Sequence, residues 1–184
     1  MKKLTYILSV FGLAIAMSAC EKIITFYPDD ASTIPGDEAL TSPEAAQQLL
    51  NSVYDVEANF LGGQVQNLGE LLADNNDDPT GRSDDFTQLY NRRTDFFNGT
   101  VDGVFRDAYI AIYRGNTLIE KVDGIPGMTP ENATRIKAEA RFIRGLNHYM
   151  IVRLFAQPFG FTPNNTHAGI TIRTSPSQTP LPRN

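Results

Sequence analysis

The segment of residues 135–156, RIKAEARFIRGLNHYMIVRLFA, has the period of an α-helix but carries apolar residues on two opposite sides. Positions three and four apart lie on the same face of a helix. One face holds Ile136, Ala140, Ile143, Met150, Ile151 and Leu154, and the opposite face holds Ala138, Phe142, Gly145, Tyr149, Val152 and Ala156. A surface helix has one apolar stripe, so a helix with two is expected to lie between neighbours. Ala138 and Gly145 predict that one neighbour is another helix that approaches closely, as in a bundle or in stacked helix pairs.

Local signals mark both ends of this helix. Thr129 can cap the first turn, and Pro130 suits the first helical position. Glu131 is favoured by the positive end of the helix. Pro158 and Gly160 end it. The sequence therefore predicts a helix that starts near residue 130 and stops before residue 158.

A second long helix is expected over residues 102–122. Its apolar face is formed by Phe105, Ala108, Tyr109, Ile112 and Ile119. Asn116 lies on that face, where its expected role is a buried structural hydrogen bond. Because the connection over residues 123–130 is short, the two long helices are expected to pack antiparallel.

An earlier helix opens at Ser42, which can cap it, followed by Pro43 and an acid in the first turn. Apolar residues follow at helical spacing to about Asn59, and GGQ at 62–64 predicts a turn. A short helix then begins near residue 66, and the aromatic-rich residues 86–98 are expected to be extended. The whole pattern predicts an all-α fold of antiparallel helix pairs with long loops.

The amino terminus has the pattern of an export signal. Lys2 and Lys3 precede an apolar run that is too short to span a membrane comfortably. The sequence MSAC then places small residues before Cys20, as in a bacterial lipoprotein box. We expect a signal peptide over 1–19, a tether on a lipidated Cys20 over 20–41, and a helical domain over 42–184. The alternatives are a secreted protein with a free cysteine and an uncleaved anchor helix.

A polar loop over residues 74–85 allows three interpretations. Asp74, Asn76 and Asp78 alternate as calcium ligands do, but Gly81 and the lack of a following glutamate do not fit an EF-hand loop. A catalytic pair of carboxylates is the second interpretation, although no spacing fixes a pair across a cleft. The third is a loop that hydrogen-bonds a polar ligand.

Charge and histidine content exclude some classes of function. The formal net charge of −5 disfavours a nucleic-acid partner, which would need a concentrated basic surface. His148 and His167 are the only histidines, and no nucleophile motif accompanies them. We therefore expect neither nucleic-acid binding nor hydrolytic catalysis.

The chain resembles the amino-terminal part of the SusD/RagB family of outer-membrane lipoproteins from Bacteroidetes-type bacteria. The resemblance covers nearly the whole chain and follows the family's order of segments. It rests on the signal ending at Cys20, TSPEAAQQLLNSVYD (41–55), GELLADN (69–75), FRDAYIAIYRGNTLIEKV (105–122), RIKAEARFIRGLNHYMIVRLFAQPFG (135–160) and THAGITIRTSP (166–176). The piece KAEARFIRG is the most specific of these.

The resemblance implies a tetratricopeptide-like scaffold and a role in nutrient uptake. Members of the family lie over a TonB-dependent, SusC-like transporter and pass it captured nutrients, mostly glycans. They are not enzymes and need no cofactor, although some bind calcium. Because the family continues with further helix pairs and a loop-rich half, this chain is expected to be a truncated, amino-terminal portion. We expect it to be lipid-anchored in the outer membrane and to face outward.

Glycan binding needs aromatic platforms and convergent polar groups in a rigid frame. The candidate ligand-binding residues are Asn75, Asp77, Arg82, Asp84 and Tyr90, with additional rings from Phe86, Phe96 and Phe97. These rings would instead serve the core if the region packs inward. The alternative functions are a helical protein-interaction scaffold without a small ligand and a truncated fragment without function.

Overall fold

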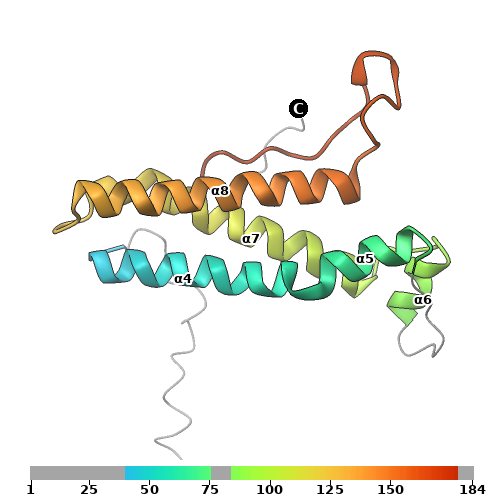
Figure 1. The fold of residues 1–184 in the computed structure, drawn as a ribbon, viewed down its shortest axis with the longest axis horizontal. Helices are drawn as coiled ribbons and strands as arrows, with labels where there is room; N and C mark the ends of the chain where they lie inside the picture. Colours follow the sequence, from blue (N-terminus) through green and yellow to red (C-terminus); the bar gives the residue numbers. More distant parts are fainter. Residues whose placement is uncertain (1–39, 76–83, 178–184) are drawn as a thin grey trace, which may run out of the picture. The chain divides into compact units, whose positions relative to one another are not determined.

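The computed structural model describes residues 40–75 and 84–177 (Figure 1). Its elements are α4 (Pro43–Asn59), the π-helical turn η1 (Phe60–Gln64), α5 (Val65–Leu72), α6 (Asp84–Tyr90), α7 (Gly99–Lys121), the 3-10 turn η2 (Val122–Gly124), α8 (Pro130–Phe155) and the 3-10 turn η3 (Pro163–Asn165). These described residues contain no strand. The predicted all-α class with antiparallel helix pairs is confirmed. The expected signal peptide and nearly all of the tether lie outside the described residues.

The helix α7 is the centre of the arrangement. It packs against α8 and also against α4. The short connection through η2 makes α7 and α8 antiparallel, as predicted, and Figure 1 shows α4 continuing through η1 into α5. Among the helices described, none is both long and apolar enough to cross a bilayer.

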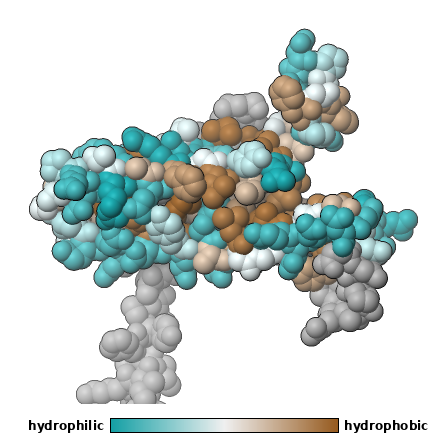
Figure 2. All heavy atoms as spheres, in the orientation of Figure 1, coloured by the Kyte–Doolittle hydropathy of each residue, from teal (hydrophilic) through white to brown (hydrophobic). Residues whose placement is uncertain are grey.

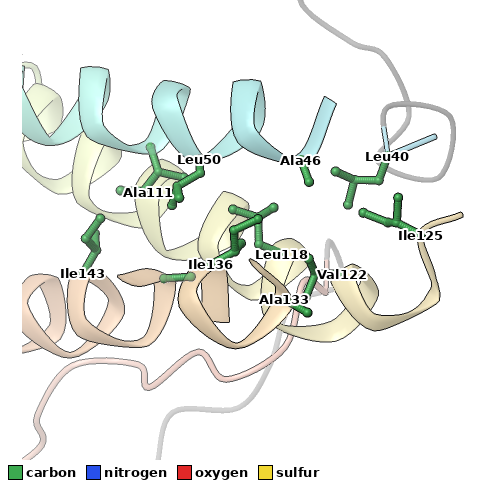
Figure 3. Packing of buried hydrophobic residues seen from close by; sticks show 12 residues of the cluster. Leu40, Ala46, Leu50, Ala111, Leu118, Val122, Ile125, Ala133, Ile136 and Ile143 are labelled. Carbon is green, nitrogen blue, oxygen red and sulfur yellow. The ribbon is translucent and has the colours of Figure 1, made fainter. Parts of the chain in front are cut away.

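The main hydrophobic core lies where α4, α7 and α8 meet. Figure 3 shows side chains from the three helices pointing toward one another there. Leu50 of α4, Leu118 of α7 and Ile136 of α8 are almost fully buried in it. A second cluster lies toward α5 and α6 and is built around Phe60, Val104, Ile112 and Ile151. Burial of these apolar surfaces is the main force that holds the helices together.

Capping side chains fix the starts of the long helices. The Ser42 and Thr129 hydroxyls accept hydrogen bonds from backbone amides in the first turns of α4 and α8, as predicted. The helix α7 begins at Gly99, three residues before the predicted start, because the side chain of Asn98 accepts from the Val101 amide. The prediction missed this cap because it placed the start at the acidic Asp102.

The close approach between helices is made by a different glycine from the predicted one. A Cβ atom on Gly115 of α7 would lie 3.4 Å from the backbone oxygen of Ala140 in α8. The absent side chain of Gly115 therefore lets the two backbones approach closely at this point. Ala138 and Gly145 do not take part, because both lie on the exposed side of α8.

The structure buries one of the two apolar faces of α8 and leaves the other open. Ile136, Ile143 and Ile151 are buried, whereas Phe142 is 70% exposed and Tyr149 is 57% exposed. Beyond the adjacent residues and backbone of α8 itself, no atom of the described residues comes within 4 Å of the position of a Cβ on Gly145. Figure 2 shows hydrophobic atoms open to solvent along α8. Within the described residues, the prediction that α8 lies between neighbours is confirmed for one face only, because spacing identifies an apolar face but not what covers it.

The predicted turn at 62–64 is confirmed, because Gly62 and Gly63 leave helical geometry inside η1 and Gly63 adopts a left-handed φ of 121°. The prediction for residues 86–98 was wrong. Residues 84–90 form α6 and are not extended, and the chain then turns before Asn98. Aromatic residues favour strands only weakly. The burial of Leu89 in the second core cluster favours the helical conformation of this segment.

A buried acid–amide pair joins α4 to α8. The Asn147 Nδ2 group donates to Glu57 Oε2 over 2.7 Å, and also to the backbone oxygen of Ile143 over 2.9 Å. Glu57 Oε1 and Asn147 Oδ1 are buried, and neither accepts a hydrogen bond from the part of the chain that the structure describes. Burial raises the pKa of Glu57, and the hydrogen bond from Asn147 opposes the rise. Two acceptors without a donor are costly in a core, so this pair favours a protonated Glu57.

We predict that Glu57→Gln stabilises the protein at neutral pH by about 1–3 kcal/mol, because the new amide can donate where the carboxylate cannot. The folded-state pKa of Glu57 lies above its unfolded value. The stabilising contribution of Glu57 to the free energy of unfolding is therefore present at acidic pH and is lost as pH rises through the folded pKa. Urea unfolding at several pH values should show this loss in the wild type and not in the variant. Glu70→Gln on the exposed side of α5 is the control, and a less stable Glu57→Gln variant would contradict the prediction.

Candidate functional site

The predicted ligand residues are only partly within the described structure. Asn75 is exposed after α5, Asp84 begins α6, Tyr90 ends it and is 37% exposed, and Asp77 and Arg82 lie outside the described residues. Asp74, the first candidate calcium ligand, instead pairs with Arg92 over 2.8 Å. Arg92 also donates to the backbone oxygen of Leu72. This region therefore ties the end of α5 to the end of α6, and its role in ligand binding stays a prediction.

A better-defined site lies on α7. Phe105, Tyr109 and Tyr113 follow one another at four-residue spacing, which places their rings along one face of the helix. An extended segment, residues 171–175, forms the opposite wall. The groove between them has a volume of about 280 Å³. We call it the α7 groove.

Hydrogen bonds from α7 hold the extended segment in place. Tyr109 Oη donates to the Thr171 backbone oxygen over 2.7 Å. The buried Asn116 donates to the backbone oxygens of Arg173 and Ser175 over 3.2 and 3.3 Å. The predicted structural role of Asn116 is thus confirmed. The hydrogen bonds of Asn116 hold the segment that forms one wall of the α7 groove. This groove was not predicted from the sequence.

Side chains from α8 hold the same segment from the other side. Arg144 donates to Asn116 Oδ1 over 2.9 Å and to the Thr174 oxygen over 3.3 Å. His148 Nε2 accepts from the Arg173 amide over 3.0 Å, and His148 Nδ1 lies 2.9 Å from the Arg144 oxygen. This arrangement requires a neutral imidazole whose proton is on Nδ1. Burial lowers the pKa of His148, the hydrogen bond to Arg144 opposes this, and the positive charge of Arg144 adds to the lowering.

The aromatic surface continues beyond the α7 groove. Phe105 packs against Tyr109 at 4.7 Å and against Phe155 of α8 at 5.2 Å between ring centroids. Phe105 and Phe155 also line a second groove of about 550 Å³, together with Phe96 and Phe97. Phe96 and Phe97 meet edge to face and are 93% and 86% exposed. The two grooves share Phe105 and form one elongated aromatic surface, with Asp95 and Asp102 at its edge.

A buried asparagine supports the turn that carries Phe96 and Phe97. Asn98 Nδ2 donates to the Asp85 oxygen and to Gln88 Oε1, while Asn98 Oδ1 caps α7. Gln88 Oε1 also accepts from the Asp95 amide. Asp85 Oδ2 accepts from the Gly99 amide. The two exposed rings are therefore presented by a hydrogen-bonded turn anchored on α6 and α7.

The sequence identified part of this surface. Phe96 and Phe97 were among the predicted rings, and the structure exposes both. Phe105 and Tyr109 were assigned to the packing face of α7. Tyr109 does pack against the second core cluster, and both rings also line the groove. The sequence did hold a signal for this groove, namely the breadth of the apolar surface on α7. One neighbouring helix covers only one apolar stripe, so a broader apolar surface leaves some rings for a groove. Arg173 gave no signal, because its position depends on contacts with Asn116 and His148 far away in the sequence.

Comparison with known proteins gives a family match and a partial relative. The model of a SusD-like family, described as starch-binding associating with outer membrane, matches residues 28–180. The SusD-like protein P25 of Formosa agariphila is 35% identical over 65 residues, which cover 35% of this chain and 12% of that protein. The match thus spans about an eighth of the length of this relative. No solved structure matches the chain significantly.

We predict that acidification loosens the extended segment, because a protonated His148 cannot accept from the Arg173 amide. The folded-state pKa of His148 is below its unfolded value, so the stabilisation is complete above about pH 6.5 and is lost as pH falls through the folded pKa. Hydrogen exchange of the Arg173 amide, corrected for its intrinsic rate, should lose protection as pH falls. Protection should be weak and nearly independent of pH in His148→Phe. Equal protection of the wild type at neutral and acidic pH would contradict the prediction.

Proposed function

The chain belongs to this SusD-like family, and from that premise we propose that it captures glycans at a bacterial outer membrane. The observation that carries the proposal is the family match over residues 28–180, described as starch-binding associating with outer membrane. Residues 96–177, which build both grooves, lie inside the matched range. The proposal assigns glycan binding to that aromatic surface.

The chemistry of the surface suits a sugar chain. Sugars present apolar C–H faces that pack on aromatic rings, and their hydroxyl groups need convergent hydrogen-bonding partners. Phe105, Tyr109 and Tyr113 offer the rings. Arg173 and Ser175 lie on the opposite wall of the α7 groove. Because the surface extends to the exposed turn at Phe96, it fits an oligosaccharide better than a single sugar.

We propose binding and not catalysis. Both His148 ring nitrogens are engaged by backbone groups, at Arg144 and Arg173. His167 Nδ1 lies 2.9 Å from Thr162 Oγ1, and His167 Nε2 lies 3.2 Å from the Gln157 oxygen. These are supporting roles in the loop structure. Neither histidine is placed as a general base for a nucleophile.

The anchor and the partner complete the proposal. The lipoprotein-type sequence ending at Cys20 supports attachment by lipid, and the family description supports the outer membrane as its place. The outward orientation of the helical domain is part of the proposal, as the resemblance implies. Several acyl chains on one cysteine would give stable anchoring. A TonB-dependent, SusC-like transporter is the proposed recipient of the captured glycan, as the resemblance implies.

We predict that a Phe96→Ala, Phe97→Ala double variant loses about thirtyfold in glycan affinity, since each of the two stacked rings contributes about 1 kcal/mol. Affinity electrophoresis against a panel of polysaccharides that starts with starch measures the retardation. Both rings are almost fully exposed, so the fold should not change. Phe159→Ala is the matched control, because Phe159 is 92% exposed and lies outside the aromatic surface. A wild-type protein that no glycan retards would refute glycan capture.

We predict that Cys20 carries the lipid. Cells fed radiolabelled palmitate should label the wild-type chain, and the Cys20→Ala variant should take no label. The wild type should also partition with membranes until detergent is added. Labelling that survives Cys20→Ala would place the lipid elsewhere, and an unlabelled wild type would end the anchoring proposal.

A further inference from the structure

We propose that His148 is a positioning residue for the α7 groove and makes glycan binding there dependent on pH, with a lower affinity in mildly acidic solution. The inference rests on the proposed glycan capture and adds a regulation of the same site. His148 is not part of the groove lining. It acts through the extended segment of residues 171–175, whose Thr171, Arg173 and Ser175 form the wall opposite the rings.

The contact that carries the proposal is the hydrogen bond from the Arg173 amide to His148 Nε2, over 3.0 Å. The donor is a backbone group of the groove wall. His148 Nδ1 lies 2.9 Å from the Arg144 oxygen, so the ring proton is on Nδ1 and Nε2 is the acceptor. A second proton on Nε2 would turn this acceptor into a donor that faces the donor of Arg173. Only the neutral ring can therefore make the bond, and acid breaks it.

The groups around the ring disfavour its protonation while the segment is in place. Arg144 of α8 and Arg173 of the extended segment are both positive. From α7, the ring of Tyr109 meets His148 edge to face, with 6.4 Å between the centroids. Burial lowers the pKa of His148, the hydrogen bond to the Arg144 oxygen opposes this, and the charge of Arg144 adds to the lowering. A ring that takes up a proton therefore favours a conformation in which the segment has moved away.

The other contacts that the structure describes between the helices and this segment do not respond to mild acid. Tyr109, Asn116 and Arg144 donate hydrogen bonds to backbone oxygens of the segment. A phenol, an amide and a guanidinium keep their donor hydrogens in neutral and mildly acidic solution. Protonation of His148 thus removes one contact and leaves the others. The expected result is a wall that loosens at Arg173, and not an unfolded chain.

The linkage between proton and glycan works in both directions. A groove that needs a neutral His148 loses affinity as pH falls through the pKa of His148 in the free protein. Bound glycan in turn favours the neutral ring, so it lowers the pKa of His148 further, and binding at a pH near that pKa releases protons. The affinity in acid approaches a limit that is about five- to tenfold lower, which corresponds to the loss of one hydrogen bond.

The first experiment measures the affinity of the full chain for soluble starch and for the other polysaccharides of the panel. Isothermal titration calorimetry in a non-ionic detergent covers the range from about pH 7.5 to about pH 5, in which a histidine of lowered pKa takes up its proton. The wild type should bind most tightly at neutral pH and several-fold more weakly at the acidic end. Titrations in buffers of different ionisation enthalpy should show that binding in acid releases protons.

Variants at position 148 separate the pH effect from a structural role of the ring. His148→Gln offers an amide oxygen that can accept from the Arg173 amide at every pH, so its affinity should not fall in acid. His148→Phe has no acceptor, so its affinity should be lower than that of His148→Gln and independent of pH. His167→Gln and Glu57→Gln are the controls, because both groups lie outside the groove lining, and each should keep the wild-type fall.

The outcomes separate a failure of this inference from a failure of the proposed function. A wild type that binds no polysaccharide at neutral pH refutes glycan capture, and the regulation of that site with it. A wild type that binds equally well at neutral and acidic pH overturns the inference and leaves glycan capture standing. A fall that persists in His148→Gln would come from another group, such as Asp95 or Asp102 at the edge of the aromatic surface, and would also overturn it.

Discussion

The contact between α7 and α8 at Gly115 is the constraint on which the rest of the described structure depends. Gly115 has no side chain, so the backbone oxygen of Ala140 can lie close to it. This close approach lets side chains from α7 and α8 both reach the extended segment of residues 171–175. Asn116 is next to Gly115, and Arg144 is one turn after Ala140, and these two side chains are hydrogen-bonded to each other. The pair then holds the extended segment from both helices.

The aromatic groove is a consequence of that arrangement. The face of α7 that carries Phe105, Tyr109 and Tyr113 is too broad to be covered by α8 and α4 alone. The extended segment covers its edge through hydrogen bonds to its backbone oxygens, and Phe105 stays 42% exposed. The lining of this groove combines aromatic rings with the polar residues Asn116, Arg173 and Ser175. This combination is the support that the structure gives to the proposed glycan site.

Local chemistry explains which predictions succeeded. The starts of α4 and α8 depend on a hydroxyl cap and a proline beside it in the sequence, so they could be predicted. The start of α7 was missed because Asn98 serves both as a cap and as the anchor of the preceding turn. The α7 groove could not be predicted, since Arg173 reaches it through contacts with residues far away in the chain. Of the predicted ligand residues, Asn75 and Tyr90 are exposed beside α5 and α6, and nothing in the described contacts joins them to the groove.

The two glycines inside the long helices show what α8 still requires. A glycine in a helix interior costs about 1 kcal/mol relative to alanine. At Gly115 that cost has a visible reason, because a Cβ would press on the backbone of Ala140. At Gly145 the described residues give no such reason, since the helix is regular there and the space around it is empty. The same empty face carries the exposed rings of Phe142 and Tyr149, which are also unfavourable in water. The described contacts therefore explain the glycine in α7 and leave the glycine between the two exposed rings of α8 without a packing role.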